Sequence, residues 1–164
     1  VFGRSTDRGI RKTLDSFKNP RARVEEAAAL GRTWKPGAVI DLSDGLGRDL
    51  LHLQEASQAA GENPPAGIMI EEEALNRLEP LGELCRKIGL NPAAIALSGG
   101  EDYELLFTIP PQTATAARIR AFKTRFGVPL TRIGTVSTEK PGLWLKIDSS
   151  GSLKQLTGNG FEHF

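Results

Sequence analysis

The chain has 164 residues, and 21 lysines and arginines against 20 aspartates and glutamates leave a formal net charge of +1. This balance argues against a basic nucleic-acid-binding module, and the length suits one soluble globular domain with a sizeable core. Nucleic acid is therefore not an expected partner. No apolar stretch is long enough to span a bilayer, so a membrane is not an expected partner either. The single cysteine, Cys85, excludes an internal disulfide and a cysteine-built metal site, which makes a reducing, cytoplasmic location the default expectation.

Hydrophobic periodicity and the positions of glycine and proline predict helices and strands that alternate along the chain. Residues 1–19 are expected to form an irregular lead-in with one short helix over 11–17. The other helices are predicted over 20–30, 46–56, 71–78, 81–88 and 113–126, and the strands over 38–40, 68–70, 103–109, 130–136 and 143–147. Interleaved elements of similar weight are typical of a mixed α/β domain, here a small mixed sheet with packed helices.

A polar cluster, Asp41-Leu42-Ser43-Asp44-Gly45, lies where the first strand gives way to a long helix. Its carboxylates and hydroxyl are oxygen donors of the kind that Mg²⁺ prefers, and the start of the helix offers N–H groups that favour phosphate. A simpler interpretation is that Ser43 caps the helix and Asp44 complements its dipole. The cap does not explain Asp41, because this residue lies too early to serve the helix end.

A second polar cluster, Ser98-Gly99-Gly100-Glu101-Asp102, comes directly before an apolar strand. Paired glycines let the backbone take a positive φ or approach a ligand closely. The alternative is an ordinary Gly-Gly turn with solvated acids at the entrance of a strand. On the strand itself, the alternation of side chains places Tyr103, Leu105, Phe107 and Ile109 on one apolar face.

The tail holds a third candidate, Gly160-Phe161-Glu162, in which an aromatic ring offers a flat face to a heterocycle. The alternative is a terminal aromatic residue that docks into the core. Four further residues are expected to be structural rather than functional: His52, Cys85, Trp34 and Trp144.

Taken in order, these three stretches resemble the C-terminal half of the thiamine-monophosphate kinases. The resemblance is carried by residues 39–46 with the helix after them, by the string LSGGEDYELLF over 97–107 and by the terminal GFEHF. It begins near the NPRARV string at 19–24 and covers nearly the whole chain. It implies a C-terminal domain of the aminoimidazole ribonucleotide synthetase superfamily over 20–164, preceded by a linker over 1–19.

The resemblance implies a kinase that transfers the γ-phosphoryl group of ATP directly to thiamine phosphate, with Mg²⁺, and so forms thiamine diphosphate. By motif, Asp41 and Asp44 would bind Mg²⁺, Ser43 would contact ATP, and Glu101 and Phe161 would hold the thiamine moiety. A carboxylate and an aromatic face both suit the cationic thiazolium ring. No catalytic residue is assigned, because such transfers depend on in-line positioning and charge neutralisation.

The acids of the second cluster leave open which carboxylate faces the ligand. Strand alternation places Glu104 opposite the apolar face of Tyr103 and Leu105, which suits a surface role. Glu101 is preferred for its place beside the paired glycines and, above all, for its match to the motif. Asp102 is kept as a further candidate.

The N-terminal half of the family, which supplies most of the metal-binding acids, has no counterpart in these residues. We expect it to be supplied in cis or in trans, and we expect the chain alone to be inactive, because Mg²⁺ needs more oxygen ligands than two aspartates provide. A homodimer of the full-length protein is a further expectation. The alternatives are half of another ATP-dependent enzyme of the superfamily and a stand-alone, non-catalytic binding module. The kinase hypothesis requires the three stretches to line one pocket.

Overall fold

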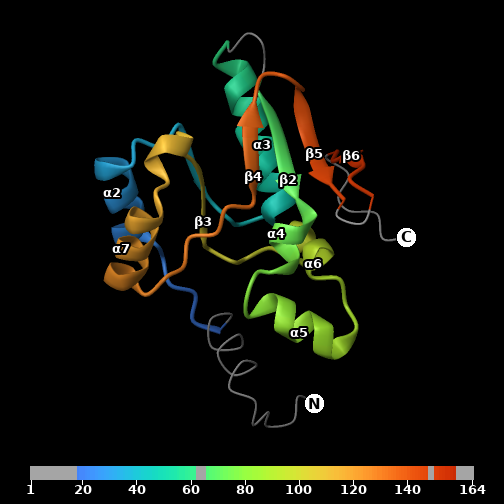
Figure 1. Cartoon of the computed structure of the whole chain (residues 1–164), viewed down its shortest axis with the longest axis horizontal. Helices are drawn as coiled ribbons and strands as arrows, with labels where there is room; N and C mark the ends of the chain where they lie inside the picture. Colours follow the sequence, from blue (N-terminus) through green and yellow to red (C-terminus); the bar gives the residue numbers. More distant parts are fainter. Residues whose placement is uncertain (1–17, 62–65, 148–149, 158–164) are drawn as a thin grey trace.

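The protein is described by a computed structural model over residues 18–61, 66–147 and 150–157, which form two small sheets with helices packed around them (Figure 1). The helices are α2 (Val24–Thr33), α3 (Leu46–Ala59), α4 (Glu72–Asn76), α5 (Leu81–Ile88), α6 (Pro92–Ser98) and α7 (Ala116–Phe126), with a 3₁₀ turn at Pro111–Thr113. The strands are β1 (Ala38–Asp41), β2 (Gly67–Glu71), β3 (Leu105–Thr108), β4 (Gly134–Ser137), β5 (Gly142–Lys146) and β6 (Leu153–Gln155). The expected mixed α/β class is confirmed.

The strands divide between a two-stranded and a four-stranded sheet. The larger sheet has the order β4-β2-β5-β6, in which β2 runs parallel to β5 and the other neighbours are antiparallel. The smaller sheet pairs β1 with β3 in antiparallel fashion, so that Asp41 at the end of β1 lies opposite Leu105 at the start of β3. The smaller sheet therefore places the two polar clusters of the sequence at the same end of one strand pair.

The structure differs from the sequence-based expectation at the start of α7 and in two elements that the hydrophobic pattern does not indicate. α7 begins at Ala116 rather than at 113, because the Thr115 side chain accepts a hydrogen bond from the backbone N–H of Arg118. The hydrophobic pattern does not indicate α6, whose start is fixed by Asn91 accepting from the backbone N–H of Ala94. The pattern also misses β6, because its three exposed residues show no hydrophobic alternation.

Two clusters of buried apolar side chains form the interior. The smaller joins α2 to α7, and there the rings of Trp34 and Phe122 meet edge-on with their centroids 6.0 Å apart. The larger lies between α3, α4, α6 and the strands β2, β3 and β5, and its buried members are Leu46, Leu50, Ile68, Ile70, Leu75, Ala93, Ala96, Leu97, Leu106, Leu143 and Leu145. Trp34 is thus a core residue, as expected, and Cys85 is buried on α5.

Strand β3 connects these two clusters, because successive side chains of a strand point to opposite sides. Leu106 belongs to the larger cluster, whereas Leu105, Phe107 and the following Ile109 pack against the smaller one. The expected apolar face is therefore confirmed for these three residues. Tyr103 does not belong to it: this residue precedes the strand, is exposed and has a φ of 51°.

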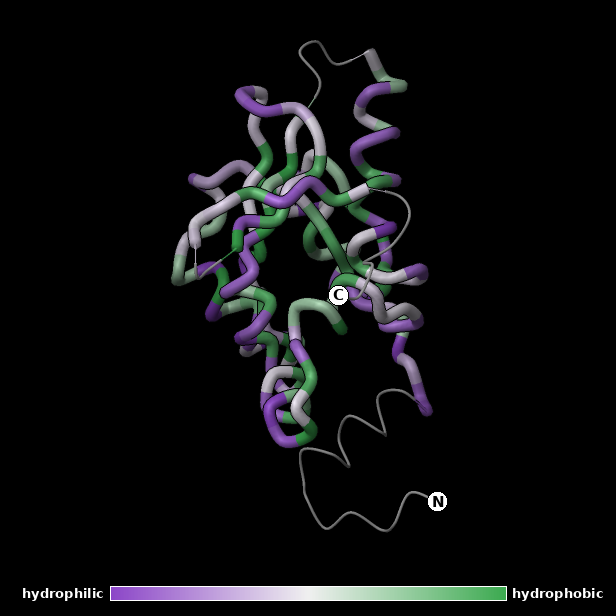
Figure 2. The backbone as a smooth tube through the Cα atoms, turned by 90° about the vertical axis from the view of Figure 1, so that its right-hand side faces the viewer, coloured by the Kyte–Doolittle hydropathy of each residue, from purple (hydrophilic) through white to green (hydrophobic). Residues whose placement is uncertain are grey.

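Helix α3 packs one side against β2 and β5, and hydrophobic and hydrophilic residues alternate along it (Figure 2). Leu46 and Leu50 are buried on this side, and so is the charged residue Asp49. A buried carboxylate is costly unless it has polar partners, so Asp49 requires a compensating structure nearby. None of the described helices, α3 included, is both long and apolar enough to cross a membrane.

The start of α3 and the end of α6 meet at nearly backbone-to-backbone distance. A Cβ atom on Gly45 would lie 2.5 Å from the carbonyl oxygen of Gly99, and one on Gly47 would lie 3.0 Å from that of Leu97. Only glycine leaves room for so close an approach. The packing of α3 on α6 therefore brings the loops at these two helix ends together.

We predict that Gly45→Ala destabilises the fold more than the matched variant Gly127→Ala. Both glycines have a positive φ, 99° and 71°, so both substitutions carry a backbone cost of about 1–3 kcal/mol. At Gly127 no described atom lies within 4 Å of the added Cβ, whereas at Gly45 the Gly99 carbonyl must move. Overpacking of this kind adds roughly 1–3 kcal/mol. Urea unfolding measures both variants, and equal losses would contradict the close contact.

Candidate functional site

Two polar loops lie side by side at the end of the two-stranded sheet. We call Asp41–Gly45 the DLSDG loop and Gly99–Asp102 the GGED loop. Backbone hydrogen bonds continue beyond the strands: Leu42 N–H donates to the Glu104 carbonyl, Tyr103 N–H to the Leu42 carbonyl, and Glu101 N–H to the Ser43 carbonyl, each at 2.8 Å. The two clusters that lie far apart in sequence are thus one continuous surface.

The paired glycines permit close backbone approach rather than a positive φ. A Cβ on Gly100 would lie 2.9 Å from the carbonyl oxygen of Ser43, while Gly99 has an ordinary φ of −70°. The positive φ values fall instead on Glu101 (64°) and Tyr103 (51°), non-glycine residues for which this conformation is unfavourable. The hydrogen bonds from these two residues to the DLSDG loop hold them there. The acids of this loop are exposed, as the turn interpretation expects, and the hydrogen bonds to the DLSDG loop fix the shape of its backbone.

No side chain of the DLSDG loop caps helix α3. The N-cap of α3 is Gly45, and no side chain makes a capping hydrogen bond there, so the interpretation of Ser43 as the cap is wrong. The side chains of Asp41, Ser43 and Asp44 belong to exposed residues at the end of β1 and before α3. They are therefore accessible to a ligand on this surface.

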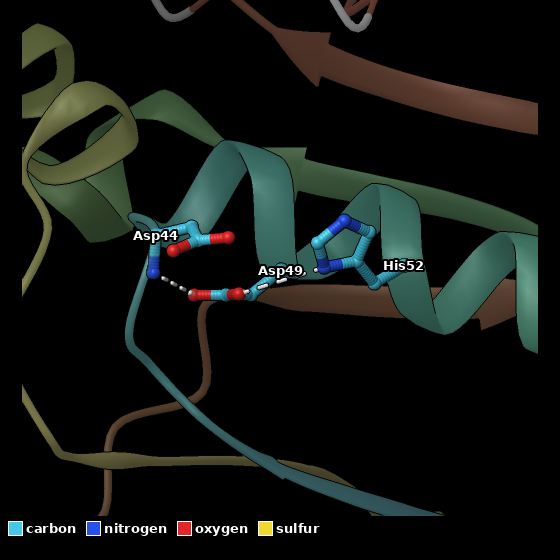
Figure 3. A group of neighbouring side chains, drawn as sticks. All are labelled: Asp44, Asp49 and His52. Atoms are coloured by element: carbon cyan, nitrogen blue, oxygen red, sulfur yellow. Dashed lines mark hydrogen bonds and ion pairs between the residues drawn. The ribbon is translucent and has the colours of Figure 1, made fainter.

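A buried carboxylate supports the DLSDG loop from beneath. Asp49 is 1% exposed, and its Oδ2 accepts hydrogen bonds from the backbone N–H groups of Ser43 (3.1 Å) and Asp44 (3.3 Å). Its Oδ1 lies 3.9 Å from Nδ1 of His52, one turn further along α3 (Figure 3). Asp49 is not among the site residues predicted from the sequence. The available signal was an acid between Leu46 and Leu50, on the side of the helix that its periodicity assigns to the core.

Several side chains at this end of the fold could bind a metal ion, and they differ in the metal that they would suit. Among the described residues, Asp44, Asp49 and His52 offer donor atoms within 4.8 Å of one another. Mg²⁺ prefers oxygen ligands over imidazole, and Asp49 already accepts the two loop amides. The exposed carboxylates of Asp41 and Asp44 are oxygen donors of the kind that Mg²⁺ prefers, and Asp41 does not belong to this group of three.

Glu101 in the GGED loop and Glu104, two residues after that loop, have different surroundings. Glu104 forms a two-pronged ion pair with Arg23 at the start of α2, with Nε–Oε2 and Nη2–Oε1 distances of 3.1 and 2.5 Å. The hydrogen bonds that Arg23 donates to Glu104 raise the pKa of the guanidinium, and Glu26 lies 3.5 Å from the same side chain. Glu101 is exposed in the GGED loop. The ion pair thus joins the start of α2 to the segment between the GGED loop and β3.

Asp102 lies between these two glutamates and has an altered acidity. Although the residue is exposed, partial desolvation raises the pKa of its carboxyl group, and the negative charge of Glu104 raises it further. The raised pKa favours the neutral form of Asp102 relative to an ordinary aspartate. Phe161, the third expected part of the site, lies outside the described residues, so the structure brings together two of the three predicted stretches.

Curated proteins that the chain resembles in sequence share one name. No protein-family model matches the chain. It is 35% identical to the thiamine-monophosphate kinase of Rhodopirellula baltica over 92% of its own length and 43% of that protein. It is 31% identical to the enzyme of the same name from Pyrococcus horikoshii over 93% of its length and 41% of that protein. The chain therefore spans less than half the length of these curated relatives.

Solved structures agree with the sequence comparison. The thiamine monophosphate kinase of Aquifex aeolicus matches with a TM-score of 0.65 and 29% identity, over 87% of this chain and 42% of that one. A structure described as AaThiL complexed with AMPPCP and TMP matches with a TM-score of 0.67 over 99% of this chain and 44% of that one. Escherichia coli HypE, at 24% identity and a TM-score of 0.53, shares the fold. By sequence and by fold, the chain is similar to part of the thiamine-monophosphate kinases, and the partial coverage agrees with the expected C-terminal half.

Proposed function

We propose that the chain is the C-terminal half of a kinase that transfers the γ-phosphoryl group of ATP to thiamine phosphate and forms thiamine diphosphate. The observation that carries the proposal is that backbone hydrogen bonds between residues 42–43 and 101–104 join the DLSDG and GGED loops into one surface. The related structure with AMPPCP, an ATP analogue, and TMP supports both substrates. We assign the domain to residues 20–164, the linker to 1–19 and the reaction to the cytoplasm.

The DLSDG loop is proposed as the nucleotide side of this surface. Asp41 and Asp44 would hold Mg²⁺, and the Ser43 hydroxyl would donate a hydrogen bond to an ATP phosphate oxygen. When bound, Mg²⁺ neutralises charge on the phosphate groups. The loop is held by the GGED loop and by Asp49, so its side chains need little reorganisation to meet the nucleotide.

The GGED loop is proposed as the substrate side. The Glu101 carboxylate would attract the positively charged thiazolium ring, and Phe161 would stack on it. Glu104 is occupied by Arg23, which supports Glu101 as the carboxylate that faces the ligand. In the reaction the bond from the γ-phosphorus to the ADP oxygen breaks as a phosphate oxygen of thiamine phosphate bonds to that phosphorus. The protein supplies alignment and no covalent intermediate.

The proposed reaction needs residues that this chain does not contain. Mg²⁺ takes about six ligands, and the DLSDG loop offers two carboxylates. We propose that acids of the N-terminal half contribute to the remaining positions. We propose that this half joins in cis or in trans, and that the full-length protein forms a homodimer.

We predict that the chain alone forms no ADP from ATP, Mg²⁺ and thiamine phosphate. Supplied with the N-terminal half, as a fusion or as a second chain, it forms ADP at a rate that depends on thiamine phosphate. A coupled ADP assay measures both cases, with thiamine phosphate omitted as the control. Turnover by the isolated chain would contradict the need for the second half. A complete protein that ignores thiamine phosphate would instead favour another enzyme of the superfamily or a binding module.

We further predict that Glu101→Gln and Glu104→Gln separate in the complete enzyme. Loss of the Glu101 charge raises KM for thiamine phosphate roughly tenfold or more, the size expected for one contact to a charged group. Glu104→Gln removes the charge that pairs with Arg23, so it lowers stability by about 1 kcal/mol and leaves KM nearly unchanged. Steady-state kinetics and thermal unfolding measure the two effects, and the reverse assignment of the KM change would contradict the proposed role of Glu101.

A further inference from the structure

The buried carboxylate of Asp49 does more than fill the side of α3 that faces the core. It receives the backbone N–H groups of the two residues whose side chains are proposed to meet ATP and Mg²⁺. We propose that Asp49 is a positioning residue: it fixes the backbone of Ser43 and Asp44 and thereby sets the directions of their side chains. The effect of Asp49 on nucleotide binding rests on the proposed function, whereas its effect on the conformation of the loop does not.

Asp49 and the DLSDG loop stabilise each other, which is why the carboxylate can fix the backbone of the loop. A carboxylate that is 1% exposed has lost almost all its water, and an unpaired buried charge is strongly unfavourable. Its hydrogen bonds come from the loop amides at 3.1 and 3.3 Å, and no buried side-chain oxygen or nitrogen among the described residues lacks a partner. If Ser43 or Asp44 turned away, the carboxylate would lose that compensation. The loop is therefore held in one conformation.

The geometry leaves the side chains of the loop free for ligands. Asp49 binds backbone groups of Ser43 and Asp44, and those residues are themselves exposed. In Figure 3 the Asp49 carboxylate lies between the Asp44 backbone nitrogen and the His52 ring, which is half-exposed. The loop thus receives its support from inside the fold, while its outer side stays open.

Amide hydrogen exchange of the chain tests the effect on the loop. In Asp49→Ala, the Ser43 and Asp44 amides should exchange roughly tenfold faster or more, as expected for loss of a hydrogen bond to a charged acceptor. The control Gln54→Ala removes another buried polar side chain of α3 and should leave both amides unchanged. Unchanged exchange at both amides in folded Asp49→Ala overturns the proposal, and so does faster exchange throughout α3 without preference for the loop.

Asp49→Asn keeps the proposal testable if the alanine variant does not fold. The asparagine oxygen still accepts the amides but polarises them less, so both amide proton resonances should move upfield. Absence of any shift at Ser43 and Asp44 overturns the proposal.

Kinetics of the complete enzyme test the consequence for catalysis. Asp49→Asn should raise KM for ATP several-fold and leave KM for thiamine phosphate unchanged, because the DLSDG loop contacts the nucleotide in the proposed function. Equal changes in both constants overturn the role in nucleotide positioning. If the wild-type enzyme fails to turn over thiamine phosphate, the proposed function fails, and the exchange experiment still decides whether Asp49 orders the loop.

Discussion

The close backbone contact between the DLSDG and GGED loops is the constraint on which the rest of the site depends. It begins as the antiparallel pairing of β1 with β3 and continues as hydrogen bonds from Tyr103 and Glu101 to the first loop. Glycines at 45 and 100 are required, because a side chain at either position would collide with the facing backbone. The site is therefore formed by main-chain geometry first, and its reactive side chains project from a surface already fixed.

This surface is anchored to the remainder of the fold on several sides. β3 places one side chain in the larger core and its neighbours in the smaller, so both cores hold the strand that leads out of the GGED loop. Asp49 holds the DLSDG loop against α3, and the pair between Glu104 and Arg23 holds the segment after the GGED loop against the start of α2. The polar residues near the site are thus of two kinds: Asp49, Glu104 and Arg23 hold the surface in place, and the exposed acids of the two loops face outward.

Much of the fold can be predicted from the local sequence pattern, whereas the site can be predicted only in part. The amphipathic period of α3 and the apolar alternation of β3 were sufficient to predict those elements, since burial of one face decides them. The local pattern could not show that Gly99 and Gly100 face the backbone of the other loop, because that contact is tertiary. The same holds for Asp49: its partners come from the loop that precedes its helix, and an acid at that position is ordinarily read as complementing the helix dipole.

The central claim is that the joined loops form one binding surface for nucleotide and thiamine phosphate. The most direct measurement is a crystal structure of the chain together with its N-terminal half, Mg²⁺, AMPPCP and thiamine phosphate. The account predicts the nucleotide phosphates and metal beside Asp41, Ser43 and Asp44, with the thiazolium ring next to Glu101. Ligands bound away from both loops, or the two loops separated from each other, would contradict it.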